Sequence, residues 1–173
     1  FDVTDADSVA NAAASLDRPI DILINNAGII GPDRQSTLDM DFDGFAQTLA
    51  VNVLAPLCVA QAFLPHLKRS EKPRLMTISS GMGSMSYASS DHLAYRASKA
   101  AVNKVTQGLA TDLRRFGIAV VSIHPGWVRT DMGGRGADIE AAQSAKGILD
   151  VAERLDLEGT GKFVRYDGAE MPW

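Results

Sequence analysis

The chain has 173 residues, of which 46% are hydrophobic, and it carries a formal net charge of −4. A hydrophobic share of this size is enough to bury a core, and the small acidic charge gives no reason to expect binding to nucleic acid or to an anionic membrane. The longest apolar stretch, Leu49 to Leu64, is interrupted by polar residues and Pro56, so we expect no membrane span. A single cysteine, Cys58, excludes an internal disulfide, and a cytoplasmic location is the default expectation.

Short apolar runs alternate with longer amphipathic stretches along the chain, which is the βα pattern of a parallel sheet. Helices are expected from Thr4 or Asp5 to about Leu16 and over residues 41–67, 92–115 and 139–155, with Gly117 ending the third of them. Strands are expected at about 20–24, 74–78, 118–123 and 162–166. Since neither an internal repeat nor a long linker divides the pattern, we predict one α/β domain over residues 1–173 with a doubly wound, Rossmann-like parallel sheet.

Three polar or glycine-containing segments stand where predicted strands end. Asn25-Asn26-Ala27-Gly28 closes the first strand, Ser79-Ser80 closes the second, and the segment from His124 to Thr130 closes the third. In open parallel sheets the ligand crevice lies outside the carboxyl ends of the strands. We therefore expect these segments to line one pocket.

Tyr95 and Lys99 are four residues apart on a predicted helix, which places both side chains on one helical face. At ~4 Å and an effective dielectric of about 20, a fixed ammonium stabilises a phenolate by roughly 4 kcal/mol. This corresponds to a decrease of about three units in the tyrosine pKa. The pair therefore predicts a general acid or base, although the same spacing also occurs on ordinary helix surfaces.

Pro56 follows Asn52 by four residues inside a helical pattern. Proline has no N–H, so the backbone carbonyl of Asn52 is expected to lack its helical partner and to accept a hydrogen bond from water instead. A kinked core helix with an incidental asparagine is the alternative interpretation.

Taken in this order, the motifs resemble those of the short-chain dehydrogenase/reductase family over nearly the whole chain. The segments Pro125–Gly134 and Tyr166–Trp173 are similar to the C-factor and sniffer-like carbonyl reductase branch. The resemblance implies hydride transfer between a nicotinamide cofactor, NADP with NAD as the alternative, and a small-molecule carbonyl or alcohol substrate. It also implies a homodimer formed through the outer faces of helices 41–67 and 92–115.

By the same resemblance, Asn52, Ser80, Tyr95 and Lys99 match the family's catalytic tetrad. Ser80 would hydrogen-bond the substrate carbonyl, Tyr95 would protonate it, and Lys99 would lower the Tyr95 pKa and hold the nicotinamide ribose. A water held by Asn52 would connect Lys99 to solvent. Ser79 competes with Ser80 for the first role, because adjacent residues of an extended chain point in opposite directions.

The resemblance also assigns the cofactor contacts. Those on the adenine and ribose side are Asp2, Val3, Asn25, Ala27 and Gly28, and those on the nicotinamide side are Tyr95, Lys99, Pro125, Gly126, Val128 and Thr130. Arg129 is either a phosphate partner or an exposed loop arginine.

Other polar residues have weaker interpretations. Met82, Met85, Tyr87 and Trp127 form a candidate apolar wall for the substrate. His92 either contacts the substrate or lies on the surface, and neither His66 nor His124 has companions at metal-ligand spacing. A hydrolase using Ser80 or Ser84 with His124 and Asp131 lacks a nucleophile elbow.

The family's glycine-rich pyrophosphate turn has no counterpart here, and Phe1–Asp5 resembles the end of the family's third strand. We therefore expect the first two strands to be missing and the chain to be truncated at its N-terminus. In the family order 3-2-1-4-5-6-7, the strand at 20–24 then becomes an unpaired edge and residues 1–5 lie detached. Weak NAD(P)H binding follows, and a catalytically silent fragment or interaction module is the alternative function.

Overall fold

A parallel four-stranded sheet lies at the centre of the computed structural model, which describes all residues from 1 to 173. The strand order is β1-β2-β3-β6, with bounds Ile22–Asn25, Arg74–Ile78, Ala119–His124 and Phe163–Arg165. In the register, Leu75 pairs with Leu23 on one side and with Val120 on the other. The predicted strands are confirmed to within two residues, and so is the parallel arrangement.

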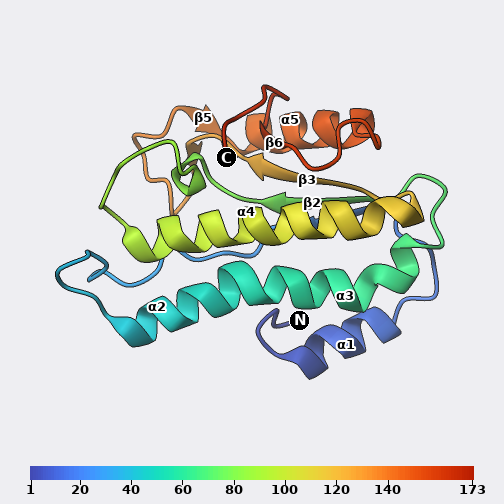
Figure 1. Ribbon diagram of the computed structural model, residues 1–173, viewed down its shortest axis with the longest axis horizontal. Coiled ribbons are helices and arrows are strands. Elements are labelled where there is room, and N and C mark those ends of the chain that lie inside the picture. The colour runs from blue at the N-terminus through green and yellow to red at the C-terminus, as the bar shows by residue number, and fades with distance from the viewer.

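Helices cover both faces of the sheet, as a doubly wound fold requires (Figure 1). One face packs on α3 (Ala55–Leu67) and α4 (Leu93–Leu113), which share a core with Leu75 and Val120. The opposite face packs on α5 (Ala141–Arg154) through a core that contains Met76 and Val121. Since residues 75 and 76 point to opposite faces, each strand is buried on both sides, and this explains its continuous apolar sequence.

An outer helix, α1 (Ala6–Ala14), packs against α3 through Val9 and Phe63. The Asp5 carboxylate caps α1 by accepting a hydrogen bond from the Asp7 N–H, as one of the two predicted caps. The helix ends at Ala14, two residues before the predicted Leu16.

The predicted helix at 41–67 is continuous but contains a π-helical turn. It comprises α2 (Phe42–Leu49), the π turn η1 (Ala50–Leu54) and α3. At this turn the Ala55 N–H donates to the Ala50 carbonyl, five residues back. Such single-turn irregularities are frequent at functional sites.

By length and composition alone, residues Phe42–Leu67 form the one helix of the structure that is long and apolar enough to cross a membrane. This finding corrects the expectation that the stretch is too polar for a span. However, 44% of its most apolar window is buried inside the structure. The helix packs on α1, β1 and α4, and burial of this kind is typical of a core helix.

Two further boundaries differ from the prediction. Residues Ile139–Glu140 form a short strand, β5, which pairs in parallel with β4 (Val128–Arg129), so α5 begins at Ala141 rather than at residue 139. At the end of α4, a 3-10 turn (Arg114–Phe116) leads to Gly117, whose φ of 72° confirms the predicted glycine cap.

Strand β1 lies at one end of the sheet and pairs only with β2. Residues 1–5 belong to no strand, and Phe1 instead stacks on Phe63 of α3, with 6.1 Å between ring centroids. The expected edge position of the strand near residues 20–24 is therefore confirmed.

Candidate active site

The side chains of Ser80, Tyr95 and Lys99 meet where β2 ends and α4 begins, and all three are buried. The Ser80 hydroxyl accepts from the Met82 N–H at 3.1 Å, and the Ser80 side chain lowers the pKa of Tyr95. The Lys99 ammonium lies 5.6 Å from the Tyr95 ring centroid and donates to the Ile78 carbonyl at 2.9 Å. The i, i+4 spacing thus brings the phenol and the ammonium together, as predicted.

The choice between the two adjacent serines is decided by their directions. Ser80 lines a cavity together with Tyr95. Ser79 points to α4, where its hydroxyl donates to the Lys99 carbonyl at 3.4 Å. Of the two, only Ser80 faces a ligand-sized space.

Burial dominates the electrostatics of the pair. It raises the pKa of Tyr95, against the lowering effect of the Ser80 side chain, and it lowers the pKa of Lys99 to about 8. The prediction that Lys99 depresses the Tyr95 pKa by about three units is therefore wrong for the protein alone. Desolvation disfavours both charged forms, and the ammonium is directed to the Ile78 carbonyl rather than to the phenol oxygen.

The lowered Lys99 pKa gives a stability prediction. Between about pH 8 and pH 10 the unfolded chain holds a proton on Lys99 that the folded chain has lost, so stability should rise with pH, by on the order of 2–3 kcal/mol. Tyr95 opposes this rise only at the upper end of the window, where the unfolded tyrosine begins to lose its proton while the buried one keeps it. Urea unfolding across the window measures the slope. Lys99→Met should abolish the rise, whereas Lys104→Met at an exposed site should retain it; equal slopes in both variants would refute the assignment.

Asn52 lies within the π turn and uses its whole side chain to join three segments. Its amide oxygen accepts from the Ile29 N–H at 2.8 Å, and its amide nitrogen donates to the Ile29 carbonyl at 2.8 Å and to the Ser98 hydroxyl at 2.9 Å. Asn52 therefore fixes the segment after β1 to α4 next to Lys99. The proton relay predicted for Asn52 uses its backbone carbonyl. The side-chain hydrogen bonds do not test that relay, which stays a prediction.

The start of α4 depends on Gln35, a buried residue that sequence reasoning missed. The Gln35 carbonyl accepts from the Leu93 N–H at 2.9 Å, and its side-chain oxygen accepts from the Tyr95 N–H at 3.1 Å. The Gln35 amide nitrogen donates to the carbonyls of Ile30 and Pro32. Gln35 thus satisfies first-turn donors that a local cap would normally satisfy. It has no sequence signal because it lies 60 residues from Tyr95.

We expect Gln35→Leu to displace Tyr95 from its place beside Ser80. The change leaves the buried Tyr95 N–H and two half-buried carbonyls without partners, so it should destabilise the fold by about 1–3 kcal/mol. Thermal unfolding measures this loss, with Gln61→Leu on the exposed side of α3 as the matched control. Equal stability of the two variants would show that Gln35 does not anchor α4.

A cavity of about 560 Å³ opens at the carboxyl ends of β2 and β3 and holds most of the predicted nicotinamide-side residues. The predicted residues that line it are Ser80, Tyr95, Pro125, Gly126, Val128 and Thr130. Met82 and Trp127 join them, so these two predictions are confirmed as lining residues. His92, for which both interpretations were open, is exposed and also lines the cavity. No Asp, Glu, Lys or Arg lines the cavity.

Some expectations about the cavity wall are wrong. Met85 and Tyr87 lie outside the cavity, with exposures of 82% and 59%. His124, which begins the segment expected to line the pocket, does line it, and burial together with the Arg165 charge lowers its pKa. Its position directly before Pro125 at a strand end was the available signal. Arg129 is occupied within the protein, because its guanidinium donates to the Ala137 carbonyl and pairs with Glu140.

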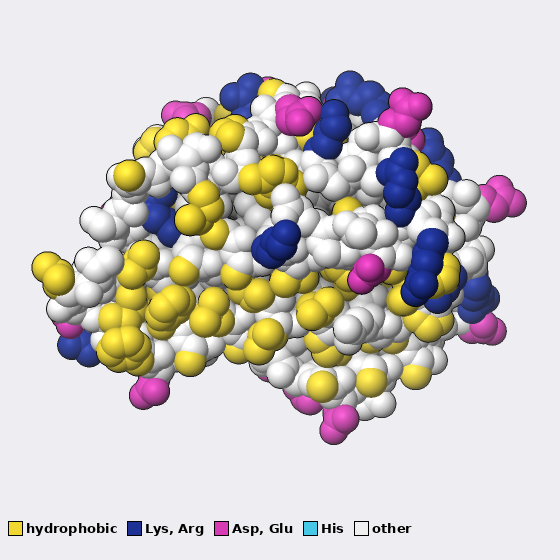
Figure 2. Space-filling model, in the orientation of Figure 1, with side chains coloured by type: hydrophobic (Ala, Val, Ile, Leu, Met, Phe, Trp, Pro, Cys, Tyr) yellow, Lys and Arg dark blue, Asp and Glu magenta, His cyan; other side chains and the backbone are white.

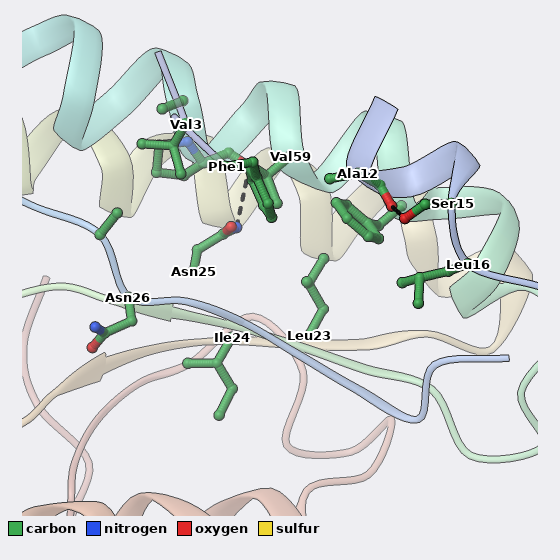
Figure 3. A pocket seen from close by; sticks show the side chains of 14 residues that line it. Phe1, Val3, Ala12, Ser15, Leu16, Leu23, Ile24, Asn25, Asn26 and Val59 are labelled. Carbon is green, nitrogen blue, oxygen red and sulfur yellow. Dashed lines mark hydrogen bonds between the residues drawn. The ribbon is translucent and has the colours of Figure 1, made fainter. Parts of the chain in front are cut away.

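A second, mostly apolar cavity of about 510 Å³ lies between α1, α3 and β1 (Figure 3). Of the predicted adenine-side residues, Val3, Asn25 and Ala27 line it, whereas Asp2 and Gly28 do not. The Asp2 carboxylate instead accepts from the N–H and hydroxyl of Thr4, which lowers its pKa. Asn25 points to α3, where its amide donates to the Pro56 carbonyl at 3.1 Å. Asn25 therefore positions the loop rather than offering its amide to a ligand.

Gly28 lies beside the side chains of Lys99 and Asn52. It follows Ala27 of the adenine-side cavity, and a β-carbon at this position would lie 3.3 Å from the Lys99 ammonium nitrogen and 3.3 Å from the Asn52 amide oxygen. A larger residue would therefore crowd the ammonium. The glycine at this position is therefore explained by its close packing against Lys99 and Asn52.

A family model described as short chain dehydrogenase matches residues 1–140. The chain belongs to the short-chain dehydrogenase family of oxidoreductases. This dehydrogenase is 43% identical over 157 residues to the C-signal of Myxococcus xanthus, covering 90% of the chain and 93% of that protein.

Solved structures give the same assignment. The NADPH-bound carbonyl reductase from chicken fatty liver superposes with a TM-score of 0.92 at 35% identity, covering 100% of this dehydrogenase and 75% of that chain. The carbonyl reductase Sniffer of D. melanogaster gives a TM-score of 0.93 at 32% identity, with coverages of 100% and 76%. The predicted resemblance to sniffer-like carbonyl reductases is thereby confirmed.

Proposed function

We propose that this dehydrogenase interconverts a neutral carbonyl compound and its alcohol with NADP, through the tetrad of Asn52, Ser80, Tyr95 and Lys99. The observation that carries the proposal is that Ser80 and Tyr95 line the same cavity and that no Asp, Glu, Lys or Arg lines it with them. NADPH-bound and NADP-bound carbonyl reductases among the structural neighbours support the choice of cofactor. When bound, NADPH supplies the hydride, which no side chain of this site provides.

The side chains have distinct tasks in the reductive direction. The Ser80 hydroxyl donates a hydrogen bond to the substrate oxygen, and the Tyr95 hydroxyl transfers its proton to that oxygen as the carbonyl carbon becomes tetrahedral. Because burial raises the Tyr95 pKa, the phenol keeps its proton throughout the neutral range. Lys99 stabilises the phenolate that remains, and a water at the Asn52 carbonyl returns a proton from solvent.

Several residues fit the cofactor. The Lys99 ammonium would hold the nicotinamide ribose, and Gly28 packs closely beside it. Gly126, Val128 and Thr130 line the cavity where the nicotinamide would bind. Val3 and Ala27 line the cavity where the adenine would bind.

The lining of the substrate cavity favours a neutral compound. Ile30, Met82, Trp127 and Met132 supply apolar surface, and no ionised carboxylate, ammonium or guanidinium is present to pair with a charged substrate. Burying an unpaired substrate charge there would cost several kcal/mol.

NADPH consumption in the presence of carbonyl compounds tests the proposal. We expect turnover with neutral ketones or aldehydes and much less with a keto acid of similar size. Absence of turnover with the whole panel, for protein that binds NADPH, would contradict the proposed function. Turnover that prefers the keto acid would contradict the substrate class.

The proposal extends to a cytoplasmic homodimer. Hydrophobic side chains gather over the face formed by α2, α3 and α4 (Figure 2). On this face, Phe42 is 78% and Leu54 is 63% exposed, values that are unusual for large apolar residues. Analytical ultracentrifugation should give twice the chain mass, and Leu54→Glu should yield monomers. A monomeric parent would refute the dimer.

A second candidate function, an interaction or signalling module without turnover, is favoured by the similarity to the protein named C-signal. In that case Tyr95 would have no chemical task, and Tyr95→Phe would leave the biological activity unchanged. The two functions are therefore separated by the same substitution.

A further inference from the structure

The segment Ala169–Trp173 runs back along β6 after a turn at Gly168, whose φ is +89°. The Arg165 N–H donates to the Ala169 carbonyl and the Met171 N–H donates to the Phe163 carbonyl, both at 2.8 Å. The Trp173 ring then stacks on the buried Phe163 ring, with 5.6 Å between centroids. The segment is thus fixed to the sheet by backbone bonds and by one aromatic anchor.

The same segment holds the pocket loop, residues 81–92, which joins Ser80 to the helix of Tyr95. The main-chain oxygen of Trp173 accepts from the Met85 N–H at 3.1 Å and from the Ser84 hydroxyl at 3.2 Å. Ser84 is buried, and its hydroxyl also accepts from the Ser86 N–H. Near the start of the loop, the Met171 methyl lies 3.5 Å from where a Gly81 side chain would begin.

These contacts act on the substrate cavity through the loop. Gly81, Met82 and His92 line the cavity, whereas neither Trp173 nor Met85 does. Between Gly83 and Leu93 the loop has no helix or strand of its own, so its course depends on its anchors. A shift of the loop would move Met82 relative to Tyr95.

We propose that Trp173 is a positioning residue that sets substrate affinity by anchoring the pocket loop at Ser84 and Met85. This proposal rests on the proposed function, because it deepens the assignment of the same cavity. It predicts an effect on KM rather than on kcat, since the loop forms the wall that contacts the substrate while Ser80 and Tyr95 are held by β2 and α4.

Trp173→Ala removes the stacking on Phe163. The main-chain oxygen of residue 173, which accepts from Met85 and Ser84 of the pocket loop, is then no longer held in place. In the protein without cofactor, we expect amide hydrogen exchange at Met85 to accelerate about tenfold, the factor that one hydrogen bond contributes. The substrate KM should rise about tenfold with kcat nearly unchanged. Trp173→Phe should restore both values, because it keeps a stacking ring.

Two further variants keep the test decisive if Trp173→Ala folds poorly. Ser84→Ala removes one of the two bonds to Trp173 and should accelerate Met85 exchange to a smaller extent. Glu170 lies on the same segment as Trp173 and forms an exposed ion pair with Lys162. Glu170→Gln alters only this ion pair and should change neither Met85 exchange nor the substrate KM. Unchanged Met85 exchange in both Trp173→Ala and Ser84→Ala, or an equal effect of Glu170→Gln, would overturn the proposal.

The exchange readout is independent of turnover. If no carbonyl compound is reduced while Met85 exchange responds as expected, the proposed function fails and the anchor remains. If turnover is lost in Tyr95→Phe but neither Met85 exchange nor KM responds to Trp173→Ala, the anchor fails and the proposed function remains.

Discussion

Tyr95→Phe should reduce carbonyl turnover by about 10²–10⁴, the contribution of one general acid, and leave NADPH affinity within a few-fold of the parent. The change deletes one hydroxyl from a buried ring, so the volume of the cavity and the packing of α4 are kept. Loss of turnover with retained cofactor binding would therefore report on proton transfer alone.

The control for this experiment is Tyr87→Phe. Tyr87 is half-exposed on the pocket loop and does not line the cavity. Its variant should match the parent in turnover and affinity. Turnover of Tyr95→Phe above about a tenth of the parent value would remove Tyr95 from the role of acid.

Gly83→Ala should have the largest effect on the architecture of the site. A β-carbon at Gly83 would lie 2.7 Å from the carbonyl carbon and 2.9 Å from the carbonyl oxygen of Lys99. These are backbone atoms in the middle of a helix, so they cannot move aside as a flexible side chain would. We expect the unfolding free energy to fall by about 3 kcal/mol, and turnover to fall by up to about 100-fold because Lys99 or the pocket loop is displaced.

Gly108→Ala is the matched control, since it makes the same chemical change on α4 at a position with nothing within 4 Å. It should raise the unfolding free energy by roughly 0.5–1 kcal/mol through helix propensity. Denaturant unfolding of both variants gives the comparison. If the two glycine variants were equally stable, the close contact between the pocket loop and Lys99 would not exist in solution.

Local patterns were sufficient to predict the layout of the fold and the centre of the site. The strands were found because each is apolar on both faces, and Tyr95 and Lys99 because one helix turn separates them. The end of β2 indicated Ser79 and Ser80, and the resemblance to the family selected Ser80. The helical irregularity near Asn52 followed from Pro56, and in the structure it takes the form of a π turn.

The features that were missed depend on contacts between residues distant in the chain. Gln35 reaches the Tyr95 N–H across 60 positions, and the oxygen of Trp173 meets Ser84 across 89. No local pattern encodes either contact. The Tyr95 pKa was predicted with the wrong sign because helical spacing reports how close two groups are but not how deeply both are buried.

Deuterium tracing tests the proposed chemistry most directly. NADPH carrying deuterium at one of the two C4 positions is incubated with the protein and a neutral ketone, in two separate reactions, and the alcohol is analysed by mass spectrometry. We predict one deuterium at the carbinol carbon from one of the two labelled forms, and no labelled alcohol with Tyr95→Phe within the same time. Alcohol formed without deuterium from either form, or formed equally fast by Tyr95→Phe, would contradict reduction by hydride transfer with Tyr95 as the acid.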